Sequence, residues 1–97
     1  MFPTEKWKLD KRGCDKAREY YLSNILRNKN MYLGIDSNMV KKIFGNPDVR
    51  LTIDGTKEFQ YILNCCSNDA NGLKSAKLLV FIIGKQKVVG ITSRISG

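Results

Sequence analysis

The sequence predicts an α+β fold in which two N-terminal helices pack on one face of a three- to four-stranded antiparallel meander. Apolar residues recur every three to four positions as far as Phe44, and every second position after Pro47. Gly45 and Pro47 stop the helical pattern between the two stretches. Helices followed by a run of strands pack as two layers, with one face of the sheet against the helices.

Residues 1–14 are expected to form an irregular lead-in, and residues 15–97 a single α+β domain. The lead-in is charged, and Trp7 is the large side chain that can anchor it on the core. The chain has 97 residues, 42% of them hydrophobic, which is enough for one core but hardly for two. No stretch approaches the roughly 20 apolar residues of a membrane-spanning helix.

The first helix is expected to run from Asp15 to about Asn28. Asp15 is a good N-cap residue, because its carboxylate can accept a hydrogen bond from an amide of the first turn. Ala17, Tyr21 and Ile25 then recur at helical spacing.

A short second helix is expected between Asp36 or Ser37, either of which can cap it, and Gly45, which can end it in a left-handed conformation. Its apolar stripe consists of Met39, Val40, Ile43 and Phe44. Such a stripe is typical of a helix face in the core, and Lys41 and Lys42 are expected to face outward.

The first strand follows Pro47 and is expected to have one buried face. Val49, Leu51 and Ile53 alternate with Arg50 and Thr52. The dipeptide Asp54-Gly55 then predicts a hairpin turn into the second strand.

The next three strands complete the meander. Phe59, Tyr61 and Leu63 should lie on one face of the second strand, with Ile62 on the other. Residues 76–83 are apolar on both faces, as in an interior strand. After a turn at residues 84–87, the last strand is expected to carry Val89, Ile91 and Ile95 on one face and Val88, Gly90, Thr92 and Arg94 on the other.

The residues that enzymes commonly use are poorly represented. Histidine is absent, which removes the commonest general base and transition-metal ligand. The nine acids are scattered, and the glycines form neither a phosphate-binding loop nor a dinucleotide-binding motif. We therefore expect no enzymatic activity, no cofactor, no metal site and no small-molecule substrate.

The three cysteines are Cys14, Cys65 and Cys66. If the first helix covers the inner face of the sheet, Cys14 can meet Cys65 and form a disulfide in an oxidising compartment. The alternative is three reduced, mostly buried thiols.

The charge of the chain favours anionic partners. Lysine and arginine together number 17 against nine acids, a formal net charge of +8, and no acid follows Asp69. The alternative is a basic surface that serves only solubility.

The sheet face away from the helices is the predicted binding surface. Ile62 and Val88 would supply an apolar centre there, with Lys85, Lys87 and Arg94 at the rim. An acidic protein surface or an anionic lipid surface fits such a face. Alternatively, Trp7 and the lead-in cover it, or it forms a homodimer. A nucleic-acid platform on Phe81 is a weaker reading, because Phe81 lies in an apolar run typical of a core.

One stretch resembles the SmpA/OmlA-type family of small outer-membrane lipoproteins, a subunit class of the bacterial barrel-assembly machinery. The residues that carry the resemblance are Gly34, Ser37, Val40, Phe44, Gly45, Pro47 and Asp48, with weaker support from Phe59 or Tyr61 and from the closing hairpin at 87–91. The resemblance implies two helices on a curved antiparallel sheet, a cell-envelope location and a scaffolding role. The same architecture is similar to that of a secreted β-lactamase-inhibitor domain, which also acts by binding.

These observations predict a non-enzymatic cell-envelope module that docks to an envelope protein or to anionic lipid. A periplasmic location would require a leader upstream of residue 1, since residues 1–8 lack the pattern of one. The alternatives are a cytoplasmic nucleic-acid-binding domain and an inhibitor of a secreted enzyme.

Overall fold

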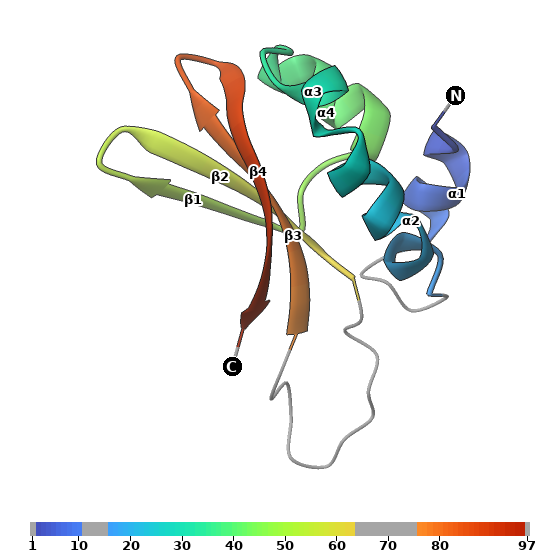
Figure 1. Cartoon of the computed structure of the whole chain (residues 1–97). Coiled ribbons are helices and arrows are strands. Elements are labelled where there is room, and N and C mark those ends of the chain that lie inside the picture. Colours follow the sequence, from blue (N-terminus) through green and yellow to red (C-terminus); the bar gives the residue numbers. More distant parts are fainter. Residues whose placement is uncertain (1, 11–15, 64–75, 97) are drawn as a thin grey trace.

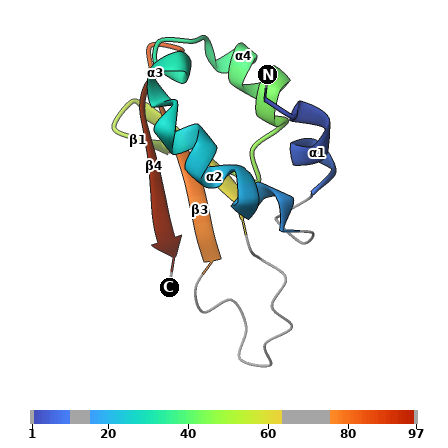
Figure 2. The ribbon, with the colours of Figure 1, turned by 45° about the vertical axis from the view of Figure 1, so that its right-hand side comes forward.

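The computed structural model describes residues 2–10, 16–63 and 76–96 (Figure 1). The elements in chain order are α1 (Thr4–Leu9), α2 (Ala17–Arg27), α3 (Lys29–Tyr32), α4 (Ser37–Phe44), β1 (Val49–Ile53), β2 (Thr56–Ile62), β3 (Ala76–Gly84) and β4 (Lys87–Ser96). The strands form one antiparallel sheet in the order β1-β2-β3-β4. The helices lie on one side of this sheet, as Figure 2 shows from a second direction. The predicted α+β class is therefore confirmed.

The expectation of an irregular lead-in is wrong for residues 4–9, which form α1. Trp7 on this helix is fully buried, and its ring lies 5.4 Å from that of Phe44 and 6.1 Å from that of Tyr61. Trp7 therefore packs on the helix-side core and does not cover the opposite face of the sheet. A six-residue helix with one anchoring side chain has too few turns to show helical periodicity in the sequence.

Helices α2 and α4 correspond to the two predicted helices. The first begins at Ala17 rather than Asp15, and its Arg18 amide donates to the buried Asp10 carboxylate at 2.8 Å. The second is capped as predicted, since Asp36 Oδ1 accepts from the Asn38 amide at 2.7 Å. Within its predicted apolar stripe, Val40 and Phe44 are buried, Ile43 is half-buried, and Met39 is exposed.

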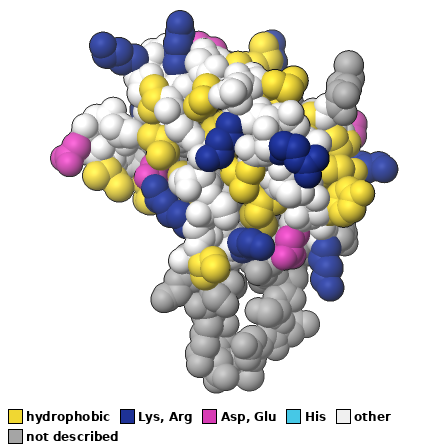
Figure 3. All heavy atoms as spheres, in the orientation of Figure 1, with side chains coloured by type: hydrophobic (Ala, Val, Ile, Leu, Met, Phe, Trp, Pro, Cys, Tyr) yellow, Lys and Arg dark blue, Asp and Glu magenta, His cyan; other side chains and the backbone are white. Residues whose placement is uncertain are grey.

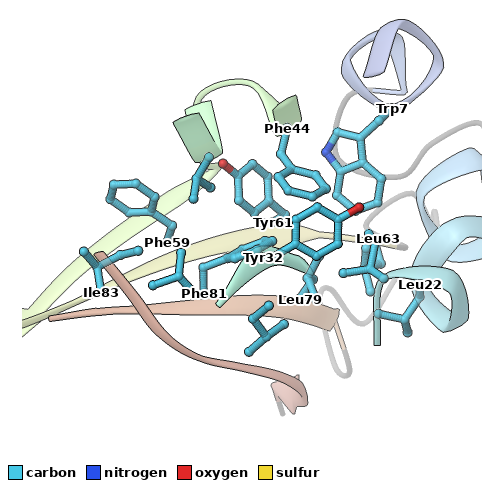
Figure 4. Packing of buried hydrophobic residues seen from close by; sticks show 14 residues of the cluster. Trp7, Leu22, Tyr32, Phe44, Phe59, Tyr61, Leu63, Leu79, Phe81 and Ile83 are labelled. Atoms are coloured by element: carbon cyan, nitrogen blue, oxygen red, sulfur yellow. The ribbon is translucent and has the colours of Figure 1, made fainter. Parts of the chain in front are cut away.

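The main core fills the space between the helices and the inner face of the sheet (Figure 4). The inner-face residues are Phe59, Tyr61 and Leu63 from β2 and its end, Leu79, Phe81 and Ile83 from β3, and Val88 and Ile91 from β4. The helices contribute Trp7, Leu22, Ile25, Tyr32, Val40 and Phe44. The prediction for β2 is confirmed over its described residues, because Ile62 belongs to a second cluster on the outer face.

A buried ion pair ties the helices to the sheet. Arg18 of α2 is only 4% exposed, and its guanidinium donates to Asp48 Oδ2 at 2.8 Å and to the Ile62 carbonyl at 3.2 Å. Asp48 Oδ2 also accepts from the Ile62 amide at 2.7 Å. The arginine thus connects α2, the start of β1 and the end of β2. It also lies over two aromatic rings, with Cζ at 5.3 Å from the Trp7 ring and 5.9 Å from the Tyr61 ring.

Gly45 supports the same junction. Its φ of +81° with ψ near 180° is a conformation that side chains rarely tolerate. This backbone turns the chain out of α4, and the Gly45 carbonyl accepts a hydrogen bond from the Tyr61 hydroxyl at 2.7 Å. Burial raises the pKa of the Tyr61 phenol far above its usual value, so this donor keeps its proton.

The prediction of a buried face on β1 is wrong. The strand lies at the edge of the sheet, and its turn end projects beyond the helices (Figure 1). Leu51 and Ile53 are 41% and 54% exposed. Arg50 pairs with Phe59 across the hairpin and therefore lies on the helix side, so the polar residues of β1 face inward and its apolar residues outward.

The predicted placement of Val88 on the outer face is wrong because β4 contains a β-bulge. Ile83 pairs with Val88 and Ile82 with Gly90, so Val89 is an extra residue between them. Val88 is consequently buried in the helix-side core, on the same face as Ile91 and not on the outer face. Val89 is 61% exposed.

An ion pair on the outer face of the sheet spans three strands. Arg94 of β4 donates two hydrogen bonds to the Glu58 carboxylate of β2, at 2.7 and 2.9 Å. The bridge crosses β3 above Val80, which is fully buried, with Ile62 and Leu78 alongside. Arg94, which the sequence predicted at the rim of a binding surface, is therefore paired with Glu58 within the fold.

The Glu58–Arg94 bridge should make stability depend on pH. The hydrogen bonds from Arg94 lower the pKa of Glu58, and this effect outweighs the opposing effect of burial. A lowered folded-state pKa gives stability that is present above the unfolded pKa of about 4.3 and lost as pH falls through the folded value. Glu58→Gln should therefore be less stable than the wild type at pH 7, and the difference should shrink toward about pH 3. Urea unfolding across this pH range measures it.

The exposed Glu5 provides the control for this measurement. Glu5→Gln should stay close to the wild type at each pH. A Glu58→Gln deficit that remains constant down to pH 3 would contradict the assignment, because the loss would then come from packing rather than from the carboxylate charge.

Candidate functional site

A pocket of about 420 Å³ lies between α4, the β1–β2 hairpin and the β3–β4 turn. Its volume is in the range of pockets that hold small molecules or side chains of a partner. It opens where the hairpin extends beyond the helices, at the uncovered end of the inner sheet face. The lining residues are Ser37, Lys41, Arg50, Leu51, Thr52, Gly55, Lys57, Phe59, Ile83, Lys85 and Gln86.

The pocket is strongly basic. Four of its lining residues are cationic, namely Lys41, Arg50, Lys57 and Lys85, and none is acidic. In the described part of the chain, no ion pair involves any of the four. Four like charges around one recess repel one another, so an anion that enters the pocket relieves this repulsion.

Each cation is positioned by a different part of the fold. Lys41 comes from the last turn of α4, and Arg50 is placed on the inner face by its pairing with Phe59. Lys57 stands on β2 between Thr52 and Ile83, and Lys85 comes from the turn after β3. The site therefore forms only when the helix, the hairpin and the turn are assembled.

Phe59 forms the floor of the pocket and orients two of the cations. The ring is 4% exposed, with Lys41 Nζ at 5.6 Å and Arg50 Cζ at 5.9 Å from its centre. Both distances are within the range of cation–π attraction. This attraction holds the two positive groups at the base of the pocket without neutralising their charge.

The β3–β4 turn is held in an uncommon backbone conformation beside the pocket. Lys85 and Gln86 have φ values of +52° and +67°, although neither is glycine. The Ser37 amide donates to the Gln86 carbonyl at 2.8 Å and fixes the turn against the start of α4. Positive φ at both central residues is what a two-residue hairpin turn between Gly84 and Lys87 requires, so the conformation follows from the β3–β4 connection.

Two other recesses are less suited to a charged ligand. One is lined by Arg18 and Asp48, whose charged groups already bind each other and the backbone, so that of its lining residues Lys8 alone is a cation outside this pair. The other is lined by uncharged residues of α2, α3 and the N-terminal segment. Among the pockets of the described residues, the basic pocket is thus the best candidate for recognition.

In the structure, the predicted partner-binding residues do not lie together on one surface. Lys85 lines the basic pocket, whereas Lys87 is exposed outside it. Val88 is in the core, Arg94 is paired with Glu58, and Ile62 is nearly buried on the outer face. Cys14 and Cys65 lie outside the described residues, so their predicted bridge stays a prediction.

The surface does not offer a single continuous basic patch on the face shown in Figure 3. Lysine and arginine side chains lie there singly or in pairs, separated by apolar and uncharged surface. Concentrated positive charge is therefore a property of the pocket rather than of this whole face.

Sequence reasoning missed Lys41, Arg50 and Lys57 as site residues. A signal for Arg50 was available, because a two-residue turn at Asp54-Gly55 pairs Ile53 with Thr56 and therefore Arg50 with Phe59. If the Phe59 side chain faces the helices, the side chain of its partner Arg50 must therefore face them too. No comparable signal marks Lys41, since its proximity to the hairpin depends on how α4 packs.

Three further observations bear on function. Among the described residues, none of the helices has the length and apolar character needed to cross a membrane. The same residues contain no cluster of three or more side chains able to bind a metal ion. Comparison of the chain with protein-family models, curated protein sequences and solved structures finds no match.

Proposed function

We propose that this protein is a non-enzymatic docking module that binds an acidic segment of a partner protein in the basic pocket. The observation that carries the proposal is the convergence of Lys41, Arg50, Lys57 and Lys85 around one recess without a lining carboxylate. The binding role agrees with the scaffolding role that the SmpA/OmlA resemblance implies. The cell-envelope location is proposed on that resemblance alone.

The shape of the pocket favours a protein segment over a lipid surface. The cations surround a recess, and carboxylate side chains of a chain segment can project into it. A bilayer surface is flat on this scale and would meet only the rim, whereas lipid-binding clusters place their cations on a common exposed surface. Single-stranded nucleic acid binds best where aromatic side chains are open to stacking, yet Phe81 is fully buried and Phe59 is 4% exposed, with Lys41 and Arg50 against its ring.

The proposal can be tested with an eight-residue poly-glutamate peptide as the probe. NMR titration should show saturable binding, with the largest shifts at Lys41, Arg50, Lys57 and Lys85. The double variant Lys41→Ala/Lys57→Ala should lose about tenfold in affinity, which corresponds to about 1.4 kcal/mol. Raising the salt concentration should weaken binding, because the attraction is largely electrostatic.

The matched control is Lys42→Ala/Lys29→Ala, which removes the same charge from exposed positions outside the pocket. Its affinity for the peptide should stay within about twofold of the wild type, since only net charge changes. Equal losses in both double variants would contradict a specific pocket. Tighter binding to vesicles containing phosphatidylglycerol or to random oligonucleotides than to the peptide would overturn the choice of partner.

A further inference from the structure

The outer edge of β1 is an unpaired edge of the sheet. In the described part of the chain, β1 pairs only with β2, so alternate residues direct backbone N–H and C=O groups away from the sheet. At the opposite edge, the start of β4 is covered: the Gly34 amide donates to the Val88 carbonyl at 2.8 Å, and the Val88 amide to the Ile35 carbonyl at 2.9 Å. The chain thus covers the start of β4 with its own backbone, whereas among the described residues no backbone covers the outer edge of β1.

The two faces of this edge strand differ in chemistry. On the inner face, Arg50 and Thr52 line the basic pocket. On the outer face, Leu51 and Ile53 are largely exposed and Val49 is half-buried, and Leu51 also borders the pocket. Side chains of a strand alternate between the two faces, so any strand added here meets positive charge with every second residue and apolar surface with the residues between.

We propose that the partner segment binds as an additional strand on the edge of β1, and that it alternates acidic and apolar residues. This inference rests on the proposed function and specifies its partner. Backbone hydrogen bonds to β1 would supply affinity, and the alternation would supply specificity. The acidic side chains enter the basic pocket opposite Arg50 and Thr52, while the apolar side chains pack on Leu51 and Ile53.

Charge complementarity selects this occupant over a second copy of the chain. If β1 paired with β1 of another molecule, two basic pockets and two copies of Arg50 would be brought together on one face. Like charges directly opposite each other in a sheet are destabilising. An acidic strand, in contrast, places carboxylates next to Arg50, on the sheet face whose pocket the other three cations also line.

The test compares four peptides of equal length on the wild-type protein. An alternating glutamate–valine peptide should bind about tenfold more tightly than a block peptide of the same composition. Methylating the backbone nitrogens of only the glutamates, or only the valines, separates the two edges of the bound strand. One of these two peptides should lose about tenfold or more, because several backbone hydrogen bonds of about 1 kcal/mol each disappear, and the other should change less than about threefold.

A protein variant distinguishes this inference from the proposed function. Ile53→Ser should weaken binding of the alternating peptide severalfold and leave poly-glutamate binding unchanged, because it alters only the outer face. If poly-glutamate binds in the pocket but alternation and both methylation patterns have no effect, strand addition is wrong and the docking function stands. If the protein instead forms dimers through β1, strand addition by a partner is wrong, and poly-glutamate binding still decides the docking function. If neither peptide binds, both proposals fail.

Discussion

Replacing Asp48 by asparagine should lower the free energy of unfolding by about 3 kcal/mol, as measured by urea denaturation at pH 7. Breaking a buried ion pair by removing one charge typically costs about 3–5 kcal/mol, because the remaining charge is left without compensation. Arg18 is 4% exposed, while Asp48 is 17% exposed, which places the expected loss at the lower end. Asparagine can still accept the hydrogen bond from the Ile62 amide, so the change isolates the charge.

Two further variants define the interpretation. Asp54→Asn removes a carboxylate from the exposed hairpin turn and should change stability by less than about 0.5 kcal/mol. The double variant Arg18→Met/Asp48→Asn should lose less than the sum of the two single changes, because no buried charge then remains unpaired. Additive losses, or a loss below about 1 kcal/mol for Asp48→Asn, would show that the pair contributes little.

Trp7→Ala should destabilise the protein by about 3–5 kcal/mol, the range for truncating a fully buried aromatic residue. The indole packs against Phe2, Phe44 and Tyr61, so its loss leaves a cavity that α1 alone cannot fill. Thermal or urea unfolding measures the effect. A small change would mean that α1 packs only loosely on the core.

Two changes in the same segment serve as comparisons. Leu9→Ala, at the 74% exposed end of α1, should stay within about 0.5 kcal/mol of the wild type. Trp7→Phe should cost much less than Trp7→Ala. The indole Nε1 is buried and has no hydrogen-bond partner among the described residues, so phenylalanine keeps much of the packing and removes an unsatisfied donor.

Much of the fold could be predicted because hydrophobic periodicity, helix caps and turn residues are local properties of the sequence. The switch at Pro47, the Asp36 cap and the Asp54-Gly55 turn each act over a few residues, and the structure confirms all three. The bulge at Val89 could not be predicted, because the pairing of β4 with β3 decides it. For β1, the alternation of residues fixes two faces but not which of them meets the helices.

The candidate site was predicted only in part, since its residues come from separate parts of the chain. Lys85 was recognised through the excess of positive charge after Asp69, but this excess does not show where in the structure the positive groups gather. Arg94 and Lys41 are both positively charged but have different roles. Arg94 pairs with Glu58 on the outer face, and Lys41 lines the pocket next to the Phe59 ring. Tertiary pairing decides between these roles.

The segment that covers the start of β4 has a consequence for cooperativity. Residues 34–37 bond to the backbone at Gln86 and Val88 immediately before α4 begins, so the helical layer and the sheet share main-chain hydrogen bonds as well as a core. Detaching α4 would therefore expose the start of β4 and release the turn that carries Lys85. Local unfolding of α4 would therefore also remove the basic pocket next to it, and a partner bound in that pocket would slow both processes.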